Sequence, residues 1–501
     1  MAEEMQHEFD TLLRSPLWRP RDLGKPLPGS PHANSACLPT WSDVIAYEQN
    51  DPRVLQRLQT GYPRFFIHPL VERFFVACAE RLARGDEFCH AYPTLSSANR
   101  AVESVRRWSG VEGRIAAWRE GGPFVVCLPR DVQKEARKHW RHAGEGISSR
   151  RAEAELSGSA EPPAREAKQA IRRQIAALTG ASLEHVYLCS SGMNAIYTVH
   201  RATQRIRGPR PTVQFGFSYV DTLKIQQDLG PGVTFLPHGT DRELDQLEGL
   251  LAGEPRAAIF TEFPSNPLLA SPNLRRLAQL AARHQVPLVV DETLGTYVNV
   301  DVLSAADVVV TSLTKYFHGA GDVMAGAVIL NARSPLVQEL HSALEAEYED
   351  TLFGADALRL LQSSRGLPAR MQQINGTAER LCEYLRAHPR VAEVYYPKYR
   401  DPENYAAFRR ADGGFGGLFS LLLHDAQRNS QPFFDALRIC KGPNLGTFFS
   451  LGCPFTLLAH FDELDFVERC GVSRYLVRIS VGLEDADDLL ERFAQALARL
   501  A

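Results

Sequence analysis

The sequence lacks the features that mark several classes of protein. No apolar run in its 501 residues approaches the roughly 18 residues that a membrane-spanning helix needs. The acidic N-terminus, MAEEMQHEFD, lacks the basic and then apolar pattern of a signal peptide. A formal net charge of −3 gives no general attraction to nucleic acid or to an anionic membrane. We therefore expect a cytoplasmic protein without nucleic-acid or membrane partners.

Cysteine pairs, metal-ligand clusters and nucleotide loops are missing as well. The nine cysteines are scattered and form no C-x-x-C pair, which argues against a disulfide framework or a zinc ribbon and favours a reducing compartment. His139 and His142 have no companion ligands at metal spacing, so no metal site is predicted. The glycines of GAGDVMAG (319–326) do not match G-x-G-x-x-G, and no G-x-x-x-x-G-K-[ST] loop occurs.

What is present indicates a globular protein with three zones. The chain is 44% hydrophobic and 23% charged, and its length is sufficient for two to four domains. Residues 1–140 predict an N-terminal extension of mixed α/β character with Pro-rich loops, 141–355 a large domain and 356–501 a small α+β domain. The final helix of the small domain is capped by Asp485 or Asp487 in this interpretation. The sequence RRAEAELSGSAEPPARE (150–166) predicts a loop.

The large domain alternates apolar strands with amphipathic helices. This alternation predicts a mostly parallel sheet with helices on both faces, and its strands are expected at 185–190, 212–216, 257–262, 286–292 and 306–312. Each of these strands ends in polar residues, and in open α/β sheets the ligand crevice lies at those carboxyl ends. The pattern therefore predicts a binding site built from several strand ends.

Lys315 is the most informative residue at these strand ends. It follows an apolar strand within TSLTKYFHGAGDVMAG (311–326). A lysine in a loop is ordinarily a solvated surface charge, but one at the floor of a crevice is partly withdrawn from water, which favours its neutral amine. A neutral amine can form a Schiff base with an aldehyde cofactor such as pyridoxal phosphate.

The other requirements of pyridoxal phosphate have candidates at neighbouring strand ends. Asp291 could keep the pyridinium nitrogen protonated, although alone it could equally be a helix cap or a solvated acid. N–H groups and hydroxyls for the phosphate are available at a strand-to-helix junction and beside the lysine, from Ser191, Gly192, Met193, Ser312 and Thr314. Taken alone, the S-G-M stretch is typical of an ordinary turn.

An amino-acid substrate needs a partner for its carboxylate, and Arg478 is the candidate. It lies inside the apolar strand YLVRISVG (475–482), where an unpaired arginine is costly. A structural ion pair is the alternative interpretation. Lysine, aspartate, phosphate-binding turn and arginine together favour pyridoxal chemistry.

The motifs that contain these residues resemble the Cys/Met-metabolism family of pyridoxal-phosphate enzymes, the cystathionine γ-synthase and γ-lyase group. The matching pieces span residues 147–501 in order: SGM (191–193), Tyr219 in a tyrosine-x-x-Thr element, E-x-P-S-N-P (262–267), D-x-T (291–293), S-x-T-K-Y (312–316), DVMAG (322–326), RGL (365–367) and VRISVGLED (477–485). The stretches SPHANSACLPTW (30–41) and TGYPRFF (60–66) are similar to the extended cystathionine γ-synthases of fungi.

This resemblance implies the aspartate-aminotransferase-like fold type I of pyridoxal-phosphate transferases, with a large, mostly parallel sheet domain and a smaller C-terminal α+β domain. It implies that Lys315 carries the cofactor and moves protons, that Tyr219 stacks on the ring and assists, and that Asn266 lies near the ring hydroxyl. Arg478 would bind the substrate carboxylate. A homodimer or homotetramer with active sites shared between subunits is also implied.

Two motifs depart from the family pattern. A Tyr-x-Arg element, which reaches the phosphate from a neighbouring subunit in the family, is Ser148-Ser149-Arg150 here, so Arg150 remains and the tyrosine is lost. In NLGTFFSL (444–451), Asn444 replaces a serine and would contact the substrate. Phe449 in the same stretch replaces a glutamate associated with the distal amino group of the substrate, which leaves the second substrate open.

The activity implied by the resemblance is γ-replacement on an O-activated L-homoserine, most simply with L-cysteine to give L-cystathionine, a trans-sulfuration step of methionine biosynthesis. Four alternatives stay open: a γ-elimination lyase, an O-acylhomoserine sulfhydrylase, a specialised γ-substitution enzyme with another nucleophile, and a pyridoxal-phosphate-binding protein without catalysis. Water access and the nucleophile pocket separate these branches, and the motifs do not define either.

Overall fold

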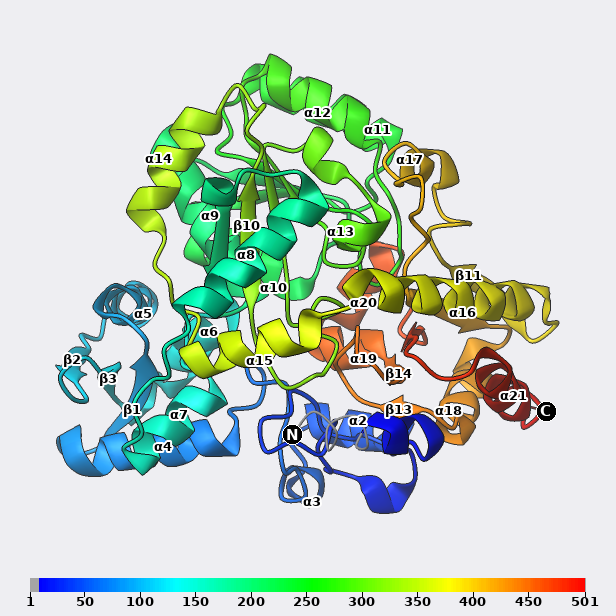
Figure 1. The fold of residues 1–501 in the computed structure, drawn as a ribbon, viewed down its shortest axis with the longest axis horizontal. Coiled ribbons are helices and arrows are strands. Elements are labelled where there is room, and N and C mark those ends of the chain that lie inside the picture. The colour runs from blue at the N-terminus through cyan, green and yellow to red at the C-terminus, as the bar shows by residue number, and fades with distance from the viewer. Residues whose placement is uncertain (1–8, 501) are drawn as a thin grey trace.

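Three β-sheets organise the chain in this computed structural model, which describes residues 9–500 (Figure 1). The central sheet has seven strands in the order β4-β10-β9-β8-β7-β5-β6. Their bounds are β4 Val186–Cys189, β5 Thr212–Phe215, β6 Val233–Leu236, β7 Ile259–Glu262, β8 Leu288–Asp291, β9 Val308–Thr311 and β10 Gly326–Leu330. β10 runs antiparallel to both neighbours and the other pairs are parallel, so the predicted, mostly parallel sheet is confirmed.

Apolar residues cover both faces of this sheet because successive side chains of a strand point to opposite sides. In β8, Leu288 and Val290 pack on one face, and Val289 packs on the other. The first face is covered by α8 (Arg165–Thr179), α11 (Asp241–Gly253) and α12 (Leu274–Arg283). The second is covered by α9 (Gly192–Arg207) and α14 (Val337–Glu347). The carboxyl ends of the strands remain clear for a site.

The small domain is built on a five-stranded sheet in the order β11-β12-β15-β14-β13. Only β13 and β14 pair in parallel. The elements are β11 Val391–Tyr395, β12 Leu418–Leu423, β13 Cys440–Lys441, β14 Leu451–Pro454, β15 Val477–Ser480, α15 Gly354–Ser364, α16 Leu367–Ala387, α18 Ala426–Ala436, α19 Phe455–His460 and α21 Ala486–Leu497. Of the two predicted caps, Asp485 is the one that accepts the first N–H groups of α21.

The N-terminal region folds into two parts. An N-terminal segment (residues 9–65) contains α2 (Trp41–Glu48) and α3 (Pro52–Leu55), and α2 packs against α18 and α19 beneath the small domain (Figure 1). An N-terminal module (residues 69–157) has an antiparallel sheet in the order β1-β3-β2 and its own apolar core. Its elements are β1 Glu87–Tyr92, β2 Arg114–Ala117, β3 Phe124–Pro129, α4 Pro69–Leu82, α5 Leu95–Ser109, α6 Gln133–Ala143 and α7 Ser149–Ser157.

Helix α7 corrects the loop predicted for 150–166. Ser148 begins it by accepting the N–H of Arg151 at 3.2 Å, and Gly158 ends it in the left-handed conformation. Ala152 and Glu155 are buried on its inner side, against the rest of the module. Burial of these two residues outweighs the polar, loop-like composition of the stretch. Only residues 159–164 match the predicted loop, because α8 begins at Arg165.

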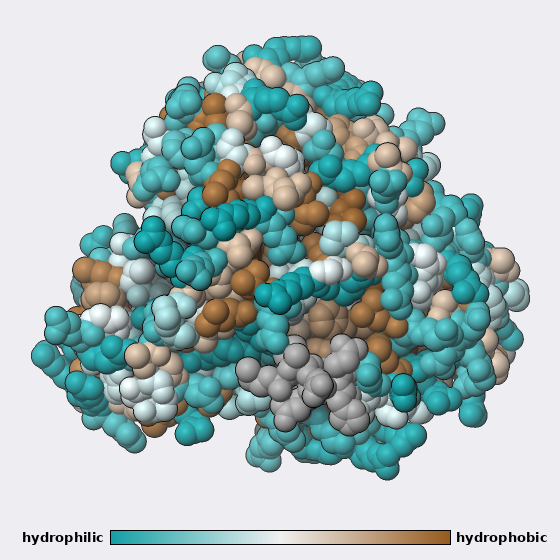
Figure 2. Space-filling model, in the orientation of Figure 1, coloured by the Kyte–Doolittle hydropathy of each residue, from teal (hydrophilic) through white to brown (hydrophobic). Residues whose placement is uncertain are grey.

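The outer surface is mainly hydrophilic on the face that Figure 2 shows, and apolar residues gather toward the middle of that face. Leu358 on α15 is one of the few large apolar side chains that are strongly exposed. Among the helices of residues 9–500, none combines the length and apolarity that crossing a membrane requires.

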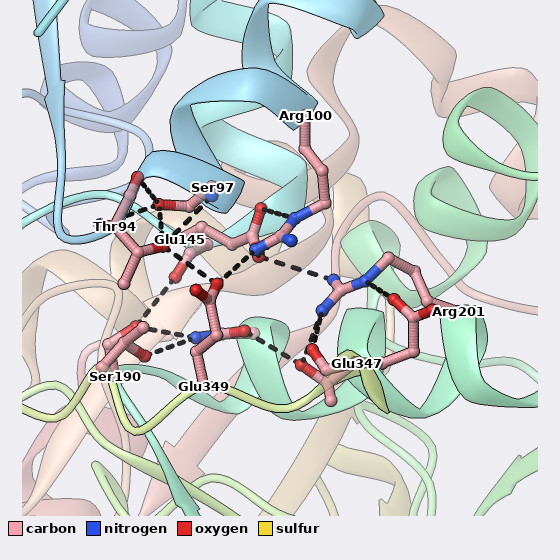
Figure 3. Close-up of polar contacts among 12 residues, drawn as sticks. Thr94, Ser97, Arg100, Glu145, Ser190, Arg201, Glu347 and Glu349 are labelled. Carbon is pink, nitrogen blue, oxygen red and sulfur yellow. Dashed lines mark hydrogen bonds and ion pairs between the residues drawn. The ribbon is translucent and has the colours of Figure 1, made fainter. Parts of the chain in front are cut away.

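A buried carboxylate joins the N-terminal module to the large domain (Figure 3). Glu145 is 2% exposed and accepts hydrogen bonds from Arg100 on α5 at 2.6 Å and from Arg201 on α9 at 3.4 Å. Arg201 also contacts Glu347, and Arg100 also contacts Glu349. Burial raises the pKa of the Glu145 carboxyl, but Arg100 and Arg201 lower it further, so the pKa lies below its ordinary value.

We expect Glu145→Gln to lower the free energy of unfolding by roughly 3 kcal/mol at pH 7, because Arg100 and Arg201 lose the buried counter-charge that they share and keep only the more exposed Glu349 and Glu347. Urea denaturation measures this loss. A lowered pKa means that the stabilisation is present above pH 4.5 and is lost as pH falls through the native value. Asp487→Asn breaks an exposed pair with Arg380 and should cost about 1 kcal/mol or less. Equal losses of stability in the two variants would contradict the conclusion that the buried carboxylate of Glu145 joins the module to the large domain.

Candidate active site

A cavity lies at the carboxyl ends of the central strands. Side chains that follow β4, β5, β7, β8 and β9 line its floor. The small domain and the N-terminal segment complete its walls, so all three parts of the chain meet there. The residues that matter for its chemistry are Tyr47, Glu48, Tyr62, Arg64, Gly192, Met193, Tyr219, Glu262, Asn266, Asp291, Thr293, Ser312, Lys315 and Arg478.

Lys315 projects into this cavity from the turn after β9. Its Nζ donates to the side-chain oxygen of Asn444 at 2.6 Å and to the hydroxyl of Tyr62 at 3.2 Å. No carboxylate of residues 9–500 forms an ion pair with it. Burial lowers the pKa of the Lys315 amine, and the Tyr62 oxygen partly offsets this effect. The result is an amine that is easier to deprotonate than an exposed lysine, as its predicted role requires.

Two carboxyl groups lie side by side on the floor, because Glu262 and Asp291 are register partners in β7 and β8. Glu262 accepts the backbone N–H groups of Tyr219 at 2.6 Å and Asn266 at 2.9 Å. Asp291 accepts the N–H of Thr293 at 2.9 Å and has no cationic partner among the described residues. Burial raises the pKa of both carboxyls, that of Glu262 to about 8. A cation beside Asp291 would stabilise its negative charge and offset the cost of burying it.

Arg478 is a buried cation on the opposite wall. It is 4% exposed, and its guanidinium donates to the side chain of Asn266 at 3.1 Å and to the carbonyl groups of Pro443 and Asn444. None of these partners carries a negative charge. The alternative interpretation of Arg478 as half of a structural ion pair is therefore not supported by its contacts. A carboxylate in the cavity would supply the missing counter-charge.

The turn between β4 and α9 forms a cradle against Ser312. A Cβ atom on Gly192 would lie 2.7 Å from the Cβ of Ser312, so only glycine allows this close approach. Gly192 and Met193 are the first residues of α9, whose leading N–H groups have no partner within the helix. Gly192, Met193 and Ser312 all line the cavity, so these N–H groups and the Ser312 hydroxyl can donate hydrogen bonds to an anion bound there.

Three of the predicted phosphate ligands, Ser191, Thr314 and Arg150, do not line this cavity and have other partners within the chain. The Ser191 hydroxyl caps α9 and donates to the Gly144 carbonyl at 2.8 Å. The Thr314 hydroxyl bonds the backbone of Ala325. Arg150 does not line the cavity: it pairs with Asp322 at 2.9 Å and with Asp356 at 3.1 Å within its own chain.

The other predicted residues surround the cavity, although Asn444 contacts it only through Lys315. Phe449 is fully buried among residues of the N-terminal segment and does not line the cavity. Sequence reasoning missed Tyr62, Arg64, Glu48 and Thr293. The stretch TGYPRFF contains Tyr62 and Arg64 with one residue between them, as in the Tyr-x-Arg element of the family. That spacing was the sequence signal that could have identified both residues.

Pyridoxal phosphate fits the groups in this cavity. Asp291 lacks a cationic partner that a protonated ring nitrogen would provide, and the Gly192 cradle offers free N–H groups for a phosphate. Lys315 supplies an amine between them, out of contact with any carboxylate of the described residues.

Comparison with known proteins agrees with this fit. A family model described as "Cys/Met metabolism PLP-dependent enzyme" matches residues 163–498. The cystathionine gamma-synthase of Neurospora crassa is 35% identical over 95% of this chain and 98% of its own. An L-2-amino-4-chloropent-4-enoate dechlorinase/desaturase of Streptantibioticus cattleyicolor is 32% identical over 94% and 97%. A solved cystathionine gamma synthase from Xanthomonas oryzae, in complex with cystathionine, has a TM-score of 0.58 at 28% identity and covers 65% of this chain and 84% of that one.

We expect borohydride reduction of the protein loaded with pyridoxal phosphate to fix the cofactor on Lys315, because that amine alone meets the other cofactor groups. Peptide mass spectrometry locates the adduct. Lys441 is the internal control: it is fully buried and burial lowers its pKa to about 7, but its Nζ donates to Pro39 and Asp435 carbonyls outside the cavity. An adduct on Lys441, or one that persists in Lys315→Ala, would refute the assignment.

Proposed function

The chain belongs to the Cys/Met-metabolism family of PLP-dependent enzymes, and we propose that it catalyses γ-replacement on an O-activated L-homoserine. In this proposal L-cysteine is the nucleophile and L-cystathionine is the product. The observation that carries the proposal is the convergence of Lys315, Asp291 and uncompensated Arg478 on one cavity. Similarity over 95% of the chain to a cystathionine gamma-synthase supports it further.

Residues of the cavity floor would hold the cofactor. Gly192, Met193 and Ser312 would bind its phosphate, Asp291 would pair with its ring nitrogen, and Tyr219 would contact the ring. When bound, pyridoxal phosphate supplies an electron sink for negative charge that develops at the Cα and Cβ atoms of an amino acid.

Arg478 binds the carboxylate of the amino-acid substrate in a bidentate manner. The guanidinium is already fixed by Asn266 and by two carbonyl groups, so little side-chain freedom is lost on binding. Fixing the carboxylate at the wall orients the bond from Cα to its hydrogen toward Lys315.

The neutral amine of Lys315 takes the proton from Cα. Asn444 and Tyr62 hold this amine in place, and its lowered pKa keeps a larger share of it neutral at pH 7. Removal of a second proton from Cβ allows the γ-acyloxy or phosphate group to leave from Cγ. The thiol gives up its proton to the departed acylate or phosphate as its sulfur bonds to Cγ, and the two protons taken from Cα and Cβ return to those carbon atoms.

We propose a homodimer or homotetramer as the working form. The apolar residues that gather toward the middle of the face in Figure 2 support an interface between subunits, as does the exposed side chain of Leu358 on α15. Light scattering of the purified protein measures the mass, and a monomer at micromolar concentration would contradict this part of the proposal.

Product analysis tests the reaction. We expect the loaded enzyme to form cystathionine from O-succinyl-, O-acetyl- or O-phosphohomoserine only when cysteine is present, because γ-replacement needs the thiol. Mass spectrometry of parallel reactions with and without cysteine identifies the product and the preferred leaving group. Formation of 2-oxobutanoate regardless of cysteine would instead indicate a lyase, and formation of homocysteine from sulfide alone would indicate a sulfhydrylase.

A further inference from the structure

We propose that Tyr62 and Arg64 complete the active site of their own chain, as positioning residues for Lys315 and Tyr219. Both residues lie in the N-terminal segment, about a hundred positions before the family match begins at residue 163. The activity readouts rest on the proposed function, whereas the spectroscopic readout below requires only bound cofactor.

Tyr62 is 8% exposed, and its hydroxyl lies 3.2 Å from Lys315 Nζ. The amine also lies 4.4 Å from the centre of the Tyr62 ring, so the phenol covers one side of it. Burial raises the pKa of the Tyr62 phenol, but Lys315 and Arg64 lower it further, below its ordinary value. Tyr62 and Asn444 therefore hold the amine through two oxygen acceptors, neither of which belongs to a carboxylate.

Arg64 ties the same segment to Tyr219. It is buried, donates to the Tyr219 hydroxyl at 2.7 Å and to the Arg141 carbonyl at 2.6 Å, and forms an ion pair with fully buried Asp221. A buried ion pair seldom adds net stability, since desolvation offsets the attraction. Net stability therefore does not explain why Arg64 is buried here. Its hydrogen bond to the Tyr219 hydroxyl does, because it positions that oxygen at the cavity.

The segment 148–150 does not provide these contacts. Ser148 caps α7, and Arg150 is bound to Asp322 and Asp356. Tyr62 and Arg64 are also a tyrosine and an arginine with one residue between them, and both reach the cavity. They belong to the same chain as Lys315.

Tyr62→Phe tests the positioning role, because it removes only the hydroxyl. Loss of that oxygen lowers the pKa of Lys315, so the acid limb of the kcat profile should move to lower pH, with a loss of about tenfold to a hundredfold in kcat. The pH titration of the visible cofactor band should shift in the same direction without turnover. Tyr384→Phe, on α16 away from the cavity, should change neither. An unmoved titration in Tyr62→Phe would refute the role.

Mixed oligomers decide whether Tyr62 acts within its own chain. Tyr62→Phe and Lys315→Ala subunits carry different tags, and the hetero-oligomer is purified on both. If Tyr62 serves its own chain, no site contains both residues, and activity stays no higher than that of Tyr62→Phe. If it serves a neighbour, intact sites form and activity rises toward half of wild type, which would overturn the proposal. If light scattering gives a monomer, any effect of Tyr62 necessarily acts within one chain.

A second, independent observation concerns Glu48, and we infer that it forms a subsite for the ammonium group of an amino-acid nucleophile. Glu48 lines the cavity at the last position of α2, and its carboxylate makes no hydrogen bond or ion pair with residues 9–500, although the charge of Arg141 acts on it. A carboxylate at a helix C-terminus opposes the helix dipole, so helix stability does not explain it. Burial raises its pKa to about 8, an effect that a cationic occupant would reverse.

Glu48 is the remaining carboxylate of the cavity that could bind the ammonium group of the nucleophile, because the other charged groups have other partners or proposed roles. Glu262 is bound to two backbone N–H groups, and Asp291 is assigned to the cofactor nitrogen in the proposed function. Arg478 takes the carboxylate of the first amino acid, and the amino group of that substrate is used at the cofactor. A remaining ammonium group belongs to the second substrate, which favours an amino thiol over sulfide.

Glu48→Gln tests this inference, which rests on the proposed function, with two thiols that differ by one amino group. We expect kcat/KM to fall about tenfold to a hundredfold for L-cysteine, and to stay within about twofold for 3-mercaptopropionate, because only the former carries the cation. The KM of the acylhomoserine should not change. Equal effects on both thiols, or no effect, would show the assignment to be wrong. A wild-type enzyme that uses no thiol would refute the proposed function itself.

Discussion

The amine of Lys315 lies out of bulk water, and the rest of the site depends on that one constraint. A buried ammonium is costly unless charge or hydrogen bonds compensate it, and here its partners are the side-chain oxygens of Asn444 and Tyr62 and no carboxylate of the described residues. Burial therefore lowers the pKa of the amine while its position stays fixed. A carboxylate in the place of either oxygen would keep the lysine charged and unreactive.

Keeping water from this amine requires all three parts of the chain. The central sheet supplies the floor, the small domain brings Asn444 and Arg478, and the N-terminal segment covers the remaining side with Tyr62 and Arg64. The segment is held there by α2 against the small domain and by Arg64 against Asp221. Glu145 anchors the module that follows it. The N-terminal region therefore functions as a wall of the active site.

Strand ends were predictable from sequence because apolar runs followed by polar residues define them. Asp291 and Lys315 fall into this group, and so does the mostly parallel sheet, whereas Arg478 was recognisable as a charge inside an apolar strand. Strand β10 escaped prediction because glycines precede its short apolar run. Hydroxyl groups were less predictable: Ser191 and Thr314 satisfy backbone groups, and nothing in their motif distinguishes that from phosphate binding. Tyr62 and Lys315 are 253 positions apart, so only the fold could bring them together.

The measurement that tests the central claim most directly is a crystal structure of the cofactor-loaded oligomer, with the chain traced from residue 62 to residue 315. We expect the Tyr62 hydroxyl and the Lys315 side chain of one and the same subunit to meet, with Arg64 against Tyr219 of that subunit. A Tyr62 that entered the site of a neighbouring subunit, or one that left the site empty of any tyrosine beside Lys315, would contradict the claim that the N-terminal segment is a wall of its own active site.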